Sequence, residues 1–191
     1  PAARAMGKQG KRTLGRQGAR DRDAAKAHAD EAKEKKAAVD AAALSELQFR
    51  KARESLDRAE KALETEEKYF ASLAPFKERE PVWYEMKEAE RRGVVRVHTA
   101  ARAAHEAAER QVLAAASAFK WKYGSLSETA AATPDRIKQE LAAAHVAVDQ
   151  SRSAQKHYEG LCKELRLLRE ASNKHVVKRT AEEPEAVTGM L

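Results

Sequence analysis

Few residues of this chain could do chemistry, and the most suggestive of them is His105. It opens the run His-Glu-Ala-Ala-Glu over residues 105–109, in which glutamate replaces the second histidine of a zinc-metalloprotease motif. His98 lies seven residues earlier, about 10 Å away along a helix, which is too far for the two imidazoles to bind one metal ion. The pattern therefore predicts ordinary helix-surface histidines and no metal site.

Patterns for nucleophilic catalysis and phosphate binding are equally incomplete. The run GKQGKRT at 7–13 lacks both the G-x-x-x-x-G-K-[ST] spacing of a phosphate-binding loop and a preceding strand. The single cysteine, Cys162, falls on an apolar helical seam, where we expect a small buried hydrophobe with no base beside it. Carboxylates occur in mixed-charge runs such as 64–68, which are typical of a solvated face. We therefore predict no catalytic residue, no cofactor and no small-molecule substrate.

Positive charge is concentrated at the N-terminus. Residues 1–20 carry six basic residues and no Asp or Glu, so they account for nearly all of the net charge of +7. They also hold four of the eight glycines and almost no large apolar side chain, so we expect an irregular arm that cannot build a core. The six basic residues are Arg4, Lys8, Lys11, Arg12, Arg16 and Arg20.

The composition of this arm favours RNA as its partner. Cations spaced by flexible glycines can follow an irregular phosphate backbone, and each neutralised phosphate releases counterions. Three other interpretations stay open: a solvated tail, a remnant of a targeting sequence and a segment that binds an acidic protein surface. Basic clusters at 50–53, 91–92, 120–122 and 166–169 could also touch phosphate, although intrahelical ion pairing is the more ordinary role of such residues.

The composition of the body predicts a thin hydrophobic core. Hydrophobic residues make up 42% of the 191 residues, but 41 of them are alanine and Ile137 is the single isoleucine. Because a buried alanine removes little area from water, an elongated bundle or a subunit that leans on neighbours fits better than a compact globule. One cysteine excludes an intramolecular disulfide, and no apolar run approaches the ~20 residues that cross a bilayer, so we expect no membrane insertion.

Two helices are predicted over 21–74 and 81–123. Pro75 ends the first and Pro81 suits the first turn of the second, and this short connection predicts antiparallel neighbours with aromatic residues of 69–84 packed at the bend. The first helix has a heptad seam of Phe49, Ala52, Leu56, Ala59, Leu63, Glu66, Phe70 and Leu73. The second has a face broad enough to contact two helices, made of Val94, Val97, Ala100, Ala101, Ala104, Ala107, Ala108, Val112, Ala114, Ala115, Phe119 and Trp121. We expect Gly124 to cap its C-terminal end.

A third helix is predicted over 133–172, because Thr133, Pro134 and Asp135 supply an N-cap hydroxyl, a first-turn proline and an acid near the positive helix end. A capping box at 125–128 suggests a short turn before it. Its seam is Ile137, Leu141, Ala144, Val148, Ser151, Gln155, Tyr158, Cys162 and Leu165, widened by Leu161 and Leu168.

These patterns predict an all-α fold, an elongated antiparallel helical hairpin or three-helix coiled-coil bundle. The domain order is an irregular basic arm over 1–20, a long-helix body over 21–172 and a short C-terminal tail over 173–191.

The functional hypothesis from these patterns is a noncatalytic structural subunit of a large ribonucleoprotein. The assembly that fits this hypothesis best is a ribosome, particularly a mitochondrial one, in which the chain is expected to bind rRNA through residues 1–20 and neighbouring proteins through its helices. Mitochondrial localisation is therefore expected, with the cytoplasm as the other possibility. The alternative is a coiled-coil scaffold, a cytoskeletal protein or a stalk-type subunit of a protein-only complex.

Overall fold

Three prolines, Pro75, Pro81 and Pro134, lie at or next to helix ends. In the computed structural model, which describes the backbone of residues 7–124 and 133–182 and the side chains of 22–124, 133–176 and 178, no strand occurs among the described residues. Helix α1 spans Gly7–Ser72, α2 spans Phe76–Arg79, α3 spans Pro81–Tyr123 and α5 spans Pro134–Glu182. The predicted all-α fold is confirmed.

The chain divides into two units, residues 1–43 and 44–191, and the division falls within α1. The first unit differs from the irregular arm expected over 1–20, because helix α1 already begins at Gly7. Each glycine costs about 1 kcal/mol in a helix, but adding residues to an existing helix avoids the unfavourable nucleation step. The glycines at the start of α1 therefore extend a helix whose downstream residues favour it.

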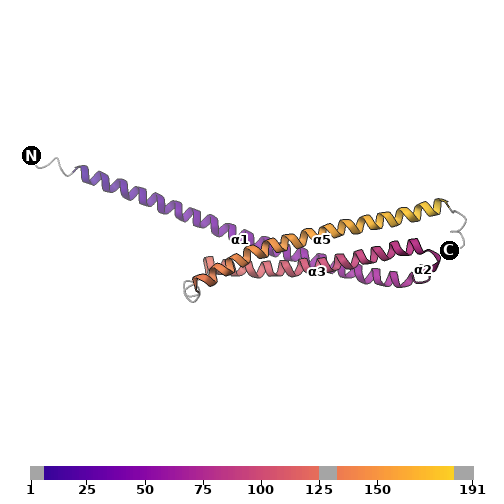
Figure 1. Cartoon of the computed structure of the whole chain (residues 1–191). Helices are drawn as coiled ribbons and strands as arrows, with labels where there is room; N and C mark the ends of the chain where they lie inside the picture. Colours follow the sequence, from indigo (N-terminus) through magenta and orange to yellow (C-terminus); the bar gives the residue numbers. More distant parts are fainter. Residues whose placement is uncertain (1–6, 125–132, 183–191) are drawn as a thin grey trace, which may run out of the picture. The chain divides into compact units, whose positions relative to one another are not determined.

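The second unit is an antiparallel three-helix bundle, in which the second half of α1, α3 and α5 lie side by side (Figure 1). All eight predicted seam residues of α1 and all nine of α5 are buried or half-buried, as is the predicted face of α3 except Phe119, which is 39% exposed. The densest packing joins Ala59, Ala101 and Leu161, one from each helix. The broad face of α3 therefore contacts two helices, as predicted.

The bend between α1 and α3 is packed by aromatic side chains. The ring centroids of Phe70 and Tyr84 lie 5.2 Å apart, and those of Phe76 and Trp83 lie 5.7 Å apart, edge to face. Tyr69, which was expected to join them, is 43% exposed. The single turn α2 between the prolines was not predicted; because it is so short, α1 and α3 must run in opposite directions.

Helix α5 begins where predicted but ends later. The backbone N–H of Arg136 donates to Thr133 Oγ1 at 3.4 Å, which is the expected N-cap. The helix continues to Glu182, so residues 173–182 are not the irregular tail that was expected. Its buried seam continues one heptad beyond Leu165 to Ser172, which is fully buried, and the helix ends just before Pro184, which disfavours helical geometry in the residue preceding it.

Of the connection between α3 and α5, the structure describes only the residues at its two ends. Gly124 ends α3 in an extended conformation and donates its N–H to the Lys120 carbonyl at 2.7 Å, so it is a C-cap without the left-handed geometry that glycine often provides there. The capping box expected at 125–128 and the tail beyond residue 182 lie outside the described residues.

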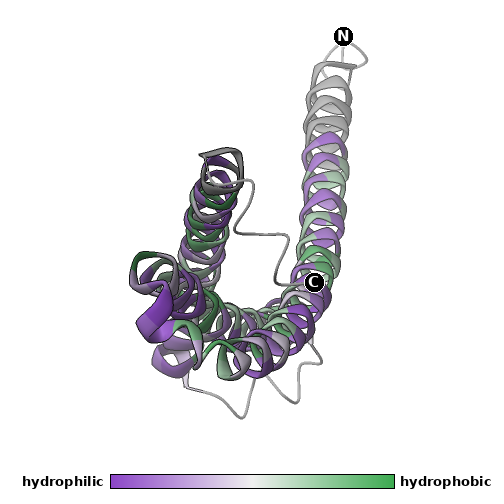
Figure 2. Ribbon diagram, turned by 90° about the vertical axis from the view of Figure 1, so that its right-hand side faces the viewer, coloured by the Kyte–Doolittle hydropathy of each residue, from purple (hydrophilic) through white to green (hydrophobic). Residues whose placement is uncertain are grey.

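Hydrophilic residues interrupt each of the long helices (Figure 2). Within the described part of the chain, no helix is both long and apolar enough to cross a membrane.

Candidate nucleic-acid interface and bundle groove

The predicted RNA-binding residues follow one another along the start of α1. Arg4 lies outside the described residues, whereas the other five positions are on the helix, although their side chains are not described. Lys8, Arg12, Arg16 and Arg20 recur every four residues, so their positions form one row that winds slowly around the helix over about 18 Å. The basic residues from Lys8 onward thus lie on a helix and not on the irregular arm that was expected.

The charge of α1 changes sign directly after this row. Residues 21–43 contain six acidic and five basic residues. Some of these charges are paired along the helix: Lys33 lies 3.8 Å from Asp30, and Lys35 lies 3.0 Å from Glu31. The hydrogen bond and charge of Lys35 lower the pKa of Glu31. The strong excess of positive charge in the first 20 residues therefore does not continue into residues 21–43.

Cations from three of the basic clusters of the bundle contact aromatic rings or a carboxylate of another helix. The Arg91 guanidinium stands 5.1 Å from the centroid of the Phe70 ring, and Arg169 lies 3.5 Å from the carboxylate of Glu66 on α1. Lys120 stands over the Trp121 ring at 5.7 Å. Arg91 and Arg169 thus contact side chains of α1, whereas Lys120 and Trp121 are neighbours on α3.

Trp121 and Glu140 join the far ends of α3 and α5. The indole Nε1–H of Trp121 donates to one carboxylate oxygen of Glu140, and Arg136 donates to the other at 3.1 Å. The Trp121 hydrogen bond, followed by that of Arg136, lowers the pKa of Glu140. This half-buried arrangement holds the C-terminal end of α3 against the N-terminal end of α5.

The residues considered for catalysis or metal binding, His105 and Cys162, pack against other side chains of the bundle. The His105 ring packs against Phe49 at 5.0 Å, and no group of three metal-binding side chains occurs among the described residues. Cys162 is half-buried and packs against the core cluster. Burial, and then the neighbouring Cys162 thiol, raise the pKa of the Tyr158 hydroxyl, whereas its hydrogen bond with Ser55 acts in the opposite direction.

A buried polar layer crosses from α3 to α1. Gln111 is 5% exposed, and its amide Nε2 donates to Ser45 Oγ at 3.1 Å and to Gln48 Oε1 at 2.9 Å. Sequence reasoning missed this layer because it considered only the apolar positions of this helix and left Gln111 out. The signal was its position: it lies one heptad after the buried Ala104, on the face that α3 turns toward α1.

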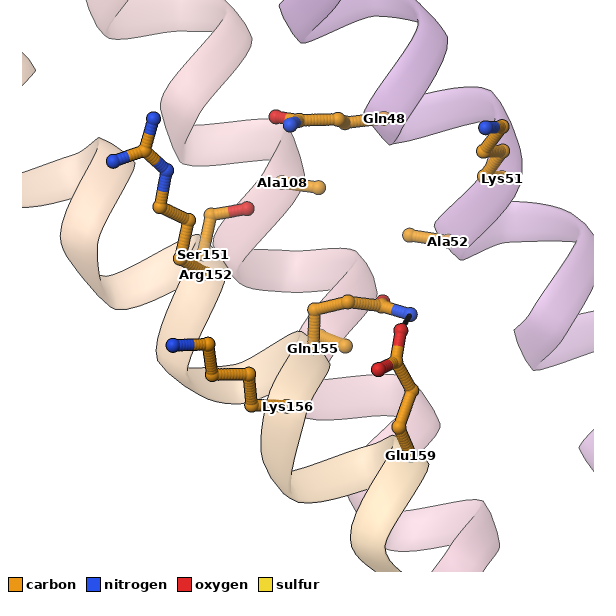
Figure 3. Close-up of a pocket in the computed structure, with 10 residues that line it drawn as sticks. Gln48, Lys51, Ala52, Ala108, Ser151, Arg152, Gln155, Lys156 and Glu159 are labelled. Carbon is orange, nitrogen blue, oxygen red and sulfur yellow. Dashed lines mark hydrogen bonds between the residues drawn. The ribbon is translucent and has the colours of Figure 1, made fainter. Parts of the chain in front are cut away.

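Beside this layer, a groove of about 300 Å³ opens where all three long helices meet (Figure 3). Its floor is formed by Ala52, Ala104 and Ala108. The groove exists because larger side chains at these positions would fill the space. The α5 wall is the two-turn stretch 151–159. Sequence reasoning missed the groove, although the polar positions Ser151 and Gln155 in the α5 seam signalled a thin layer at this height.

Comparison with known proteins provides no functional information: no protein-family model, no curated protein and no solved structure matches this chain.

Proposed function

We propose that this chain is a noncatalytic structural subunit of a large ribonucleoprotein, which binds RNA through residues 1–20 and protein neighbours through its bundle. The observation that carries the proposal is the distribution of charge. Six basic residues and no acidic one precede residue 21, while the following 23 residues are nearly neutral. A local excess of this kind supplies the phosphate contacts that dominate affinity for nucleic acid.

The helical backbone of residues 7–20 changes how these contacts would be made. Four basic positions recur every four residues, so a helix can present them to phosphates in a fixed order. A helix laid against RNA loses less conformational entropy on binding than a disordered segment does. Within this class of assembly, a ribosome, and a mitochondrial one in particular, is the setting we propose for a chain with a basic extension on a long alanine-rich helical body.

The rival function is a coiled-coil scaffold that dimerises through the seam of residues 49–73. The packing of the bundle argues against this mode, because the seam is already buried within the chain. Ala52, Ala59 and Leu73 are each no more than 5% exposed. Dimerisation through these residues would require α1 to leave α3 and α5.

Fluorescence anisotropy with a labelled 20-nucleotide RNA, measured over a salt series, tests the proposal. If all six cations contact phosphates, the affinity of the intact protein falls roughly 300-fold between 50 and 200 mM salt, since each contact on a single strand contributes about −0.7 to the logarithmic salt slope. A variant with all six replaced by glutamine is expected to lose nearly all of this dependence.

The matched control removes the same charge from the bundle. It replaces six exposed cations by glutamine, namely Lys61, Lys77, Arg92, Lys138, Lys163 and Lys174. We expect this control to keep most of the affinity of the intact protein. Equal losses in the two variants would show that only net charge matters, and salt-insensitive binding by the intact protein would reject the role of residues 1–20.

A further inference from the structure

We propose that the groove among α1, α3 and α5 is a docking site for a helix of a partner protein, one that carries two apolar residues flanked by acidic residues. The proposal concerns the bundle alone, so it stands or falls independently of RNA binding by residues 1–20. It rests on the shape of the groove, a serine hydroxyl that faces it, an exposed apolar surface beside it and the charges on its two sides.

The shape of the groove calls for an apolar insert. The methyl groups of Ala52, Ala104 and Ala108 form its floor, and these residues are at most 4% exposed. A volume of about 300 Å³ corresponds to roughly ten molecules of liquid water, at ~30 Å³ each. Replacing water over an alanine floor by apolar side chains is favourable. Residues 151–159 span about 12 Å along α5, enough for two side chains one turn apart on a docked helix.

Ser151 adds a specific polar contact. It is 7% exposed and belongs to the lining of the groove. In Figure 3 the Ser151 Oγ points across the groove toward Ala108 and Gln48. A polar group of a docked partner would form a hydrogen bond with this hydroxyl in place of water.

The α1 side of the groove continues into exposed apolar surface. Leu44 and Leu47 are 52% and 48% exposed. Leu44 lies one turn before Gln48, and Leu47 lies one turn before Lys51, so both leucines adjoin residues that line the groove. A helix seated in the groove can extend over these leucines, which enlarges the apolar contact beyond the hollow itself.

Charge on the two sides selects an acidic partner. Lys51 stands on the α1 side, and Arg152 and Lys156 stand on the α5 side with their charged ends turned outward (Figure 3). None of the three forms an ion pair with the described residues. The only lining acid is Glu159, which accepts a hydrogen bond from the Gln155 amide at 2.9 Å.

Acidic residues on both flanks of a docked helix would meet these cations, and the cations would steer its approach. RNA would meet the cations too. It would, however, leave the alanine floor and Leu44 uncovered, so a helix fits the surface better.

Binding of a designed peptide tests the proposal. The probe is a capped, labelled alanine-based helix with two leucines four residues apart and glutamates on both flanks, titrated with the full-length protein. We expect saturable binding with a Kd in the micromolar range, weakened at least about tenfold when the peptide glutamates become glutamines. Double reversal of Lys51→Glu and Lys156→Glu is expected to weaken it similarly, and Ser151→Leu, which fills the floor, is expected to abolish it.

A matched reversal at exposed positions away from the groove, Lys61→Glu with Lys138→Glu, is expected to leave the affinity within about twofold. Circular dichroism checks that each variant remains folded, and the Lys51/Lys156 pair carries the test if Ser151→Leu does not fold. The absence of binding up to about 1 mM peptide, or equal weakening by both double reversals, would overturn the proposal. An RNA oligonucleotide that displaces the peptide from the intact protein, but no longer binds the Lys51→Glu/Lys156→Glu variant, would also overturn the proposal, because it would assign the groove to nucleic acid.

Discussion

Replacing Ser172 by alanine should stabilise the protein, although most substitutions in a core destabilise. Ser172 is fully buried on α5, and its Oγ has no hydrogen-bond partner among the described residues. In the unfolded chain the same hydroxyl is hydrogen-bonded to water. Folding therefore loses those hydrogen bonds without replacing them, and removing the hydroxyl removes that cost.

Two contributions set the expected size of the effect. Alanine is a better helix former than serine by up to about 0.5 kcal/mol, and an unsatisfied buried hydroxyl costs about 1–3 kcal/mol. Ser172→Ala should thus raise the free energy of unfolding by about 1–3.5 kcal/mol. For a chain of this size that corresponds to an increase in Tm of roughly 2–14 °C.

The control for Ser172→Ala is Ser153→Ala on the same helix. Ser153 is exposed, so its replacement should give only the helix-propensity gain of about 0.5 kcal/mol. Urea unfolding followed by circular dichroism gives both free energies. Equal changes for the two variants, or a loss of stability in Ser172→Ala, would show that the buried hydroxyl is satisfied and would refute the reasoning.

Further predictions concern the backbone, a buried ion pair and alkaline pH. Gly160→Ala should stabilise α5 by about 1 kcal/mol, because the added methyl would have no atom within 4 Å apart from the adjacent backbone of its own helix. Gly93→Ala should stabilise the protein less, because its methyl would lie 3.0 Å from the side chain of Leu165 on α5. Equal increases in Tm for the two variants would contradict this prediction. The side chains of Lys87 and Glu90 are 12% and 5% exposed, and their charged groups lie 3.0 Å apart. Lys87→Met leaves the Glu90 carboxylate buried without its partner, so it should lower the free energy of unfolding in urea by about 3 kcal/mol. The double variant with Glu90→Leu should recover most of that loss. The raised pKa of Tyr158 means that its contribution to stability is intact below the unfolded pKa of about 10 and is lost as pH rises through the folded pKa. Tyr158→Phe should therefore make the Tm fall less steeply above pH ~10 than in the parent; identical profiles would argue against this contribution.

The helices were predictable because their signals are local. Pro75, Pro81 and Pro134 fixed three helix ends to within a few residues, and the heptad seams on either side identified the buried faces. The two outer ends were wrong for the same physical reason. Glycines at the start of α1 and polar residues after Ser172 disfavour an isolated helix, but each segment continues a helix that is already formed.

The groove depends on information that no single helix contains. Ala52, Ala104 and Ser151 are each an ordinary small residue in a seam. These residues fall in one layer only because of how the three helices are aligned along the bundle axis. That alignment depends on the packing at both ends of the bundle. The six basic residues of the N-terminus were found from composition, whereas the row that four of them, Lys8, Arg12, Arg16 and Arg20, form along α1 became apparent only with the helix in place.

The Gln111 layer also fixes how far α3 can slide along α1. Alanines repeat every seven residues on both helices, as at Ala52 and Ala59 or at Ala101 and Ala108, so a shift of one heptad would exchange one alanine contact for another at little cost in buried area. Such a slip would separate Gln111 from Ser45 and Gln48 and leave a buried amide without partners. In a bundle whose apolar contacts are so alike, a single glutamine can decide which of several nearly equivalent alignments the chain adopts.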